Sequence, residues 1–141
     1  MKTYSDLLDI DTRLRLHIEL EPVGTPDITV SVNDVVDDYP GLSDNIILDY
    51  HIDLLDLFFI DIELRNKHYT TKYETAVIIK RLCIDNIELI PQYDYLAKYV
   101  NDHHNNNPTS YLGFNGKWRL TFDQPFYHWL HQVTGQGWLL D

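Results

Sequence analysis

Two strand-like runs that flank one polar loop, between residues 57 and 90, constrain the fold of this chain more than any other feature of its sequence. In the first run, residues 57–65, apolar and polar side chains alternate, which is typical of a half-buried β-strand. The second run, residues 76–89, is rich in β-branched residues, and residues 66–75 between the runs contain no apolar run to bury. We expect an antiparallel pair at the centre of a sheet, with a long connecting loop available for binding.

Shorter alternating runs lie on both sides of this central stretch. Residues 14–20 and 28–32 each alternate, and the link between them, which contains proline and glycine, predicts that the two strands pair as a hairpin. Residues 46–51 and 117–122 predict two further strands. The strands are too close together for crossover helices, so we expect an all-β chain, an antiparallel β-sandwich or jelly roll with one short C-terminal helix.

The segments between these strands are assigned from turn chemistry and from breaks in the alternation. Asn33 and Asp34 mark a turn, and residues 36–45 are expected to be a loop. The apolar alternation shifts near residues 85–86, which predicts a β-bulge or a tight turn, and residues 95–100 fit a short amphipathic helix or a tyrosine-packed loop. The predicted core consists of Phe58, Ile60, Ile62, Leu64, Ile78, Leu82 and Ile84.

The length of 141 residues predicts a single domain, 1–141. Residues 1–12 are expected to form an N-terminal arm, and residues 123–141 a short helix followed by an apolar tail. The polar N-terminus and the lack of a long apolar run predict a soluble chain without a secretion signal or transmembrane segment. The one cysteine, Cys83, is expected to be a buried structural thiol.

A formal net charge of -11 limits the classes of partner. Nucleic acid and anionic membrane surfaces are excluded, because binding them requires clusters of lysine and arginine. Cations, neutral glycans and basic protein partners remain compatible with an acidic surface, and simple solubility is the alternative explanation. No nucleophile motif and no phosphate-binding loop occurs, so we expect a protein that is not an enzyme.

Two sets of side chains are candidates for binding metals. Zinc would be bound by histidines with a carboxylate, and the candidates are His103, His104, His128 and His131. Calcium requires several oxygen ligands, and the candidates are Asp34, Asp37, Asp38, Asp44, Asn66, Glu74, Asp85 and Asn86. Neither set has a recognised metal-site spacing, and solvated turns or ordinary surface and core histidines are the alternative for both.

Several aromatic side chains are candidates for stacking on sugar rings, because the apolar face of a sugar matches the face of an aromatic ring. They are Tyr39, Tyr50, Tyr69, Tyr73, Tyr111 and Trp118. Burial in the core is the alternative role for each of them.

Four short segments, 26–28, 32–34, 64–66 and 84–87, follow one another in an order that resembles calcium-dependent, xylan-binding-type carbohydrate-binding modules. The resemblance implies carbohydrate recognition without catalysis, through loops 33–45 and 66–75, with calcium as a possible cofactor. It implies a ligand-binding set in which tyrosines stack on the sugar while an amide and a carboxylate orient hydroxyls or a cation: Tyr69, Tyr73, Asn66 and Glu74. Lys67 stands where that family has an acidic residue.

The C-terminal end supports a different hypothesis, a structural or assembly protein that binds other protein subunits. Trp138, Leu139 and Leu140 follow two glycines, and such apolar side chains either fold back on the domain or dock on a neighbour. Segments 126–131 and 137–140 also have a faint similarity to small structural proteins of tailed phages. Under this hypothesis Trp138, Leu139 and Leu140 form an interface, and a homo-oligomer is possible.

Overall fold

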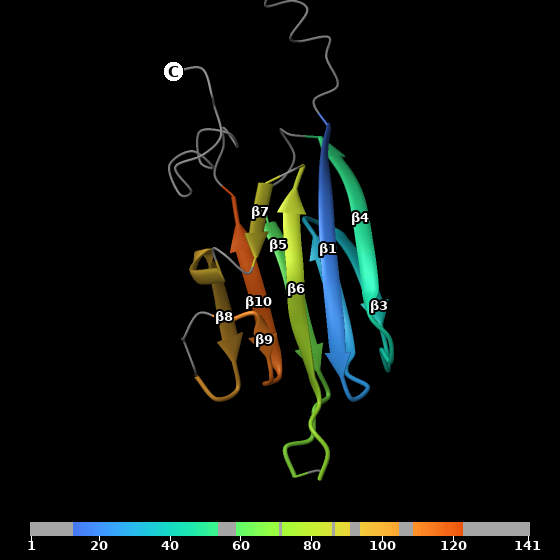
Figure 1. Cartoon of the computed structure of the whole chain (residues 1–141). Helices are drawn as coiled ribbons and strands as arrows, with labels where there is room; N and C mark the ends of the chain where they lie inside the picture. Colours follow the sequence, from blue (N-terminus) through green and yellow to red (C-terminus); the bar gives the residue numbers. More distant parts are fainter. Residues whose placement is uncertain are drawn as a thin grey trace, which may run out of the picture.

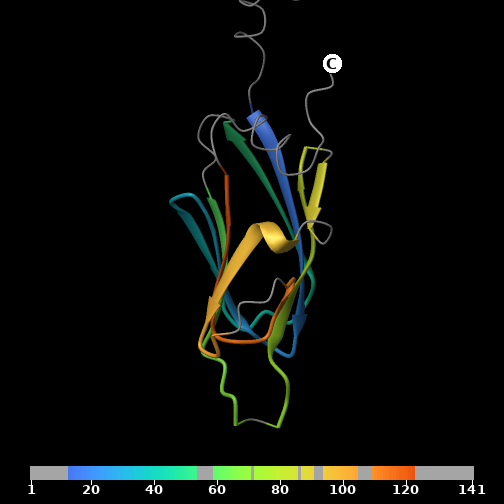
Figure 2. The same cartoon turned by 90° about the vertical axis from the view of Figure 1, so that its left-hand side faces the viewer.

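The computed structural model describes residues 13–53, 59–70, 72–85, 87–90, 94–104 and 109–122, which form two five-stranded antiparallel sheets. The strand order in the first sheet, sheet A, is β4 (Ile46–Asp53), β1 (Arg13–Val23), β6 (Ala76–Ile84) and β7 (Ile87–Ile90), with β9 (Tyr111–Leu112) pairing with β6. The order in sheet B is β3 (Val35–Tyr39), β2 (Asp27–Val32), β5 (Phe59–Arg65), β10 (Gly116–Thr121) and β8 (Ala97–Asn101). The sheets face one another, and a 3-10 turn, η2 (Asp94–Leu96), precedes β8 (Figures 1 and 2).

The predicted β-sandwich is therefore confirmed, and its core lies between the two sheets. Alternation places Ile28, Val30 and Val32 of β2 on the inner face, and the same rule buries Trp118 and Leu120 of β10. The predicted core residues that are confirmed as buried are Ile60, Ile62, Leu64, Leu82 and Ile84. Residues 1–12, Phe58 and residues 123–141, with the predicted helix and tail, lie outside the described residues.

One core prediction, Ile78, is wrong, because β6 carries a β-bulge. Leu20 of β1 pairs with Ile79, whereas the preceding residue Glu19 pairs with Arg81, so Lys80 is an extra residue in the ladder. Beyond the bulge the facing of the side chains is reversed. Ile79 is consequently buried and Ile78 is only half-buried.

Two predicted strand pairings are also wrong. β1 and β2 do not form a hairpin, since β1 pairs with β4 and β6 in sheet A whereas β2 pairs with β3 and β5 in sheet B. The central runs β5 and β6 likewise lie in opposite sheets, so the loop of residues 66–75 crosses from one sheet to the other. Alternation specifies which face of a strand is buried, but it does not specify the neighbour with which that strand forms hydrogen bonds.

The predicted turns hold better than the predicted loops. Asn33, with a φ of 52°, lies in the turn between β2 and β3, and Asp85, with a φ of 53°, lies in the tight turn between β6 and β7. The expected loop at 36–45 is wrong in its first part, which belongs to edge strand β3, and the helix or loop at 95–100 is mostly strand β8. Among the described residues, no helix is long and apolar enough to cross a membrane.

Candidate functional site

The loop that joins β5 to β6 extends beyond the strand ends at one end of the sandwich (Figure 1). It forms an open pocket of about 280 Å³. Its described lining residues are Lys67, His68, Tyr69, Lys72, Tyr73 and Glu74. The structure thus brings together three of the four ligand-binding residues suggested by the sequence, Tyr69, Tyr73 and Glu74. Tyr73 is the most open of them, with 79% of its surface exposed.

Lys67 ties this pocket loop to the turn between β9 and β10. Its ammonium donates hydrogen bonds to the carboxylate of Glu74 and, at 2.6 Å, to the carbonyl oxygen of Gly113, and its side chain is only 9% exposed. The hydrogen bond from Lys67 is the main cause that lowers the pKa of Glu74, and the backbone N–H of Thr75 donates a further bond to the same carboxylate at 2.9 Å. Glu74 is therefore held ionised at the wall of the pocket.

Tyr69 is held by hydrogen bonds at its hydroxyl and by an aromatic contact at its ring. The hydroxyl donates to Asp102 at 3.2 Å and accepts the backbone N–H of Asn115 at 2.8 Å. The ring packs edge-to-face on His103, with the centroids 4.7 Å apart, and His103 in turn stacks on Phe114 at 4.1 Å. Desolvation is the largest cause that raises the pKa of the Tyr69 phenol. With 43% of its surface exposed, Tyr69 presents a fixed aromatic surface to the pocket.

Asn115 is a supporting residue for which the sequence carried no signal. Its side-chain oxygen accepts the backbone N–H of Lys67 at 2.7 Å, and its amide nitrogen donates to the Lys67 carbonyl at 2.9 Å, much as a neighbouring strand would. The turn that carries Asn115 is held by Tyr99, whose hydroxyl accepts the N–H of Phe114 at 3.0 Å and donates to the carbonyl of the same residue. Burial raises the pKa of Tyr99 to about 12.

Asn66 faces away from the pocket, towards the turn that follows β3. It has a φ of 59°, and its amide donates to Asp27 at 3.2 Å. The other carboxylate oxygen of Asp27 accepts the N–H of Gly41 at 2.8 Å, and this bond is the main cause that lowers the pKa of Asp27. Asp27, which the sequence did not single out, thus links the pocket loop to the start of the 40–45 loop.

The proposed binding segment 33–45 is divided by the strand within it. Strand β3 separates the turn at Asn33 and Asp34 from the 40–45 loop. The turn lines a different pocket of about 370 Å³, together with residues 50–52 of β4. The start of the 40–45 loop reaches the loop of residues 66–75 through Asp27, which is bonded to both Gly41 and Asn66.

The pocket residues do not fit a bound calcium ion. Within the described parts of the chain, no group of three or more His, Cys, Asp or Glu side chains is placed to hold a metal. The carboxylate of Glu74 and the carbonyl of Gly113 are the hard oxygens that calcium favours, but the ammonium of Lys67 already binds both.

Of the histidines considered for zinc, His103 stacks on Phe114, and His128 and His131 lie outside the described residues.

The other aromatic residues that the sequence suggested as sugar contacts differ in their exposure to solvent. Trp118 is 1% exposed, so of the two roles considered for it the structure supports burial in the core. Tyr39 and Tyr50 are half-buried, and Tyr111 is 41% exposed. Cys83 is buried as predicted, and burial raises the pKa of its thiol.

Comparison with solved structures identifies the fold. No protein-family model matches the sequence, and no curated protein is similar to it. The solved structure of vCBM60 in complex with galactobiose matches 76% of this chain and 97% of its own, with a TM-score of 0.50 and 13% identity. The fold is that of vCBM60. A selenomethionine form of vCBM60, from work on a circular permutation that links two families of calcium-dependent carbohydrate-binding modules, matches 80% of this chain and 97% of its own with a TM-score of 0.49 and 8% identity.

The similarity to vCBM60 in its galactobiose complex spans almost the whole of that module and about three quarters of the present chain. The resemblance to carbohydrate-binding modules that the sequence carries is therefore confirmed for the fold. The two-sheet arrangement places the pocket loop, the 40–45 loop, the turn between β1 and β2 and the turn between β9 and β10 at one end of the sandwich (Figure 2).

Proposed function

We propose that the chain is a non-catalytic carbohydrate-binding module, and that the pocket of the 66–75 loop is its binding site. The observation that carries the proposal is this tyrosine-bearing pocket in a chain with the fold of vCBM60, whose structure was solved with galactobiose. Binding sites are concave, and they combine an apolar surface with a few placed polar groups. Tyr69 and Tyr73 supply the apolar surface, and Glu74, His68 and Lys72 supply the polar groups.

In this proposal the two tyrosines have different roles. Tyr69 is fixed by Asp102, Asn115 and His103, so it orders no further when a sugar ring stacks on it. Tyr73 is far more exposed and covers the sugar from the loop. The ionised carboxylate of Glu74 accepts hydrogen bonds from sugar hydroxyls in addition to those from Lys67, Thr75 and the Tyr111 phenol.

We further propose that binding at this pocket does not require calcium. The ammonium of Lys67 bridges a carboxylate and a backbone carbonyl, and so it supplies a fixed positive charge of the protein's own. A divalent cation placed among the same oxygens would be repelled by that ammonium. Lys67 thereby orders the loop through the contacts that a bound cation would otherwise make.

Calorimetric titration of the full chain with galactobiose, xylobiose and longer neutral oligosaccharides, with calcium and with a chelator, tests both proposals. We expect binding to at least one neutral saccharide that is unchanged by the chelator. Replacing Tyr73 by Ala should weaken that binding by about fivefold, because a stacked aromatic ring contributes roughly 1 kcal/mol.

Tyr95→Ala is the matched control, because Tyr95 is an exposed tyrosine of the η2 turn, with 56% of its surface exposed, and it does not line the pocket. It should leave the affinity unchanged. The proposal is wrong if no neutral saccharide binds, or if Tyr95→Ala weakens binding as much as Tyr73→Ala. Loss of binding on chelation would overturn the calcium-independent part.

One observation favours the alternative function, a structural or assembly protein that binds other protein subunits. Edge strand β3 exposes Val35 and Val36 to 60% and 58%, and such an edge can pair with another chain. The tail residues proposed as an interface lie outside the described residues. Sedimentation of the full chain and of a chain without residues 136–141 tests this alternative, which predicts a folded truncated chain that no longer forms oligomers.

A further inference from the structure

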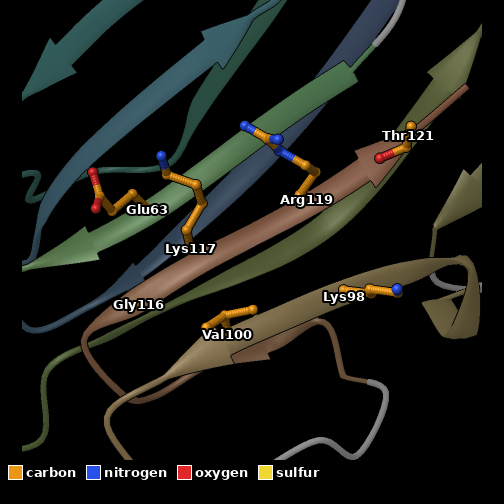
Figure 3. Close-up of a pocket in the computed structure, with 7 residues that line it drawn as sticks. All are labelled: Glu63, Lys98, Val100, Gly116, Lys117, Arg119 and Thr121. Carbon is orange, nitrogen blue, oxygen red and sulfur yellow. The ribbon is translucent and has the colours of Figure 1, made fainter.

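A second pocket, of about 550 Å³, lies on the outer face of sheet B, on β5, β10 and β8 (Figure 3). Its charged lining residues, Glu63, Lys98, Lys117 and Arg119, alternate along their strands with side chains that face the core. This pocket shares no lining residue with the pocket of the 66–75 loop.

The strand register places like charges next to one another on this face. Arg119 of β10 pairs directly with Lys98 of β8, and Lys117, two residues earlier, pairs with Val100 of β8 and Glu63 of β5. Directly opposed side chains on one face lie within interaction distance, so a Lys98–Arg119 pair costs free energy unless negative charge compensates it.

Asp61 compensates only part of this charge and also opens the pocket. It is 3% exposed and accepts two hydrogen bonds from Arg119, at 2.7 Å and 2.8 Å, while the ammonium of Lys117 lies 4.0 Å away. These contacts draw Arg119 and Lys117 towards β5, as Figure 3 shows, and away from β8. Gly116, which alternates with the outward-facing Lys117, lines the pocket between β10 and β8 with its backbone alone.

The pocket is therefore positive on a chain of net charge -11. Its three cations, Lys98, Lys117 and Arg119, face the carboxylates of Asp61 and Glu63, which leaves one positive charge in excess. Among the described residues, Lys98 has no carboxylate within ion-pair distance. An anion bound beside Lys98 would relieve the repulsion with Arg119 that the register imposes, and Lys117 adds to the positive potential of the same pocket.

We propose that this pocket is a second binding site, for the carboxylate-bearing sugar units of an acidic polysaccharide. Lys98 binds the carboxylate of one unit and Lys117, whose ammonium points away from Lys98 (Figure 3), binds that of a neighbouring unit. Val100, 73% exposed, together with the aliphatic stem of Lys117, contacts a sugar ring. The saccharide part of this assignment rests on the proposed function, whereas the requirement for an anion rests on the charges of the pocket alone.

Titration of the full chain with trigalacturonate, at low and at moderate salt, tests the site. We expect binding that weakens as salt increases. The double variant Lys98→Gln/Lys117→Gln should weaken it by about tenfold or more, because charge-assisted hydrogen bonds are lost. Lys80→Gln is the matched control, since Lys80 is an exposed lysine of sheet A, with its side chain 53% exposed, and its ion pair with Glu21 is 3.6 Å long. It removes the same kind of charge and should leave binding unchanged.

Three results would overturn the proposal: no binding of trigalacturonate, equal weakening by Lys80→Gln, or unchanged binding in the double variant. Equal affinity for a short polyglutamate of the same charge would overturn the saccharide assignment. Tyr73→Ala separates this site from the pocket of the 66–75 loop, because it should leave trigalacturonate binding intact. If neutral saccharides fail to bind while trigalacturonate binds and the double variant loses it, the loop-pocket proposal fails and this one stands.

Discussion

Replacing Lys67 by Met tests the central claim about the candidate site, that one nearly buried ammonium holds the pocket loop in place. Methionine keeps an unbranched apolar stem and removes only the charge and its hydrogen bonds. The variant leaves the Gly113 carbonyl without its 2.6 Å donor and the Glu74 carboxylate without its partner. The loop would then remain attached through the Asn115 contacts to the Lys67 backbone.

The expected cost is worked out from these two contacts. A hydrogen bond from a charged donor to a buried acceptor contributes about 1.5–3 kcal/mol. The pair with Glu74 adds only about 0.5 kcal/mol, because that carboxylate is 52% exposed and water replaces the lost partner. We expect Lys67→Met to lower the free energy of unfolding by about 2–3.5 kcal/mol in urea denaturation.

Lys72→Met is the control, because Lys72 is an exposed lysine that lines the same pocket. It should change the free energy of unfolding by about 0.5 kcal/mol or less. Hydrogen exchange adds a local readout. The backbone amides at positions 67 and 115 should exchange faster in Lys67→Met than in the natural chain, and should be unchanged in Lys72→Met. If the two variants destabilise the chain equally, or if Lys67→Met has no effect, Lys67 does not hold the loop.

Three further predictions concern the core, a close approach of two strands, and pH. Replacing Ile62, which is 0% exposed, by Ala should lower the free energy of unfolding by about 2–5 kcal/mol, as measured by urea denaturation. Gly116→Ala should cost about 1–3 kcal/mol in the same assay, because the new Cβ would lie 2.3 Å from the Val100 carbonyl oxygen, and a cost near zero would show that β8 moves freely. The pKa of Glu74 lies below its usual 4.5, so its contribution to stability is fully present above pH 4.5 and is lost as pH falls through the lowered value. Urea midpoints followed into acid should therefore fall more steeply in the natural chain than in Lys67→Met, and parallel curves would contradict this.

The strand content and most of the core were predictable from the sequence, because alternation is a local property. Buried side chains in β1, β2, β5 and β10 follow directly from period two, as Leu16, Ile28, Ile62 and Trp118 illustrate. The turns at Asn33 and Asp85 follow from residues that tolerate a positive φ. The failures fall where a local pattern is interrupted, at the β-bulge around Lys80, and where it is weak, at edge strand β3 with its two aspartates.

The candidate site was predictable in part. A polar loop with two tyrosines between apolar strands indicated where a ligand would bind, and Tyr69, Tyr73 and Glu74 do line one pocket. Nothing in the sequence indicated that Asn66 bonds Asp27, or that the Lys67 ammonium donates a hydrogen bond to the Gly113 carbonyl. The pocket on sheet B could not be predicted from the sequence either. Its charged residues come from three strands, and alternation within one strand does not show which strands are its neighbours.

By itself, the sequence determined that this chain is an acidic, all-β protein with one face of most strands buried. Only the tertiary structure decided which strands share a sheet, and therefore which polar groups meet. The Lys67–Gly113 hydrogen bond spans 46 residues, the Lys67–Asn115 pair spans 48, and the Arg119–Asp61 pair spans 58. Contacts at such separations arise from the order and register of the strands, which follow from how both sheets pack together and not from the alternation of any one strand.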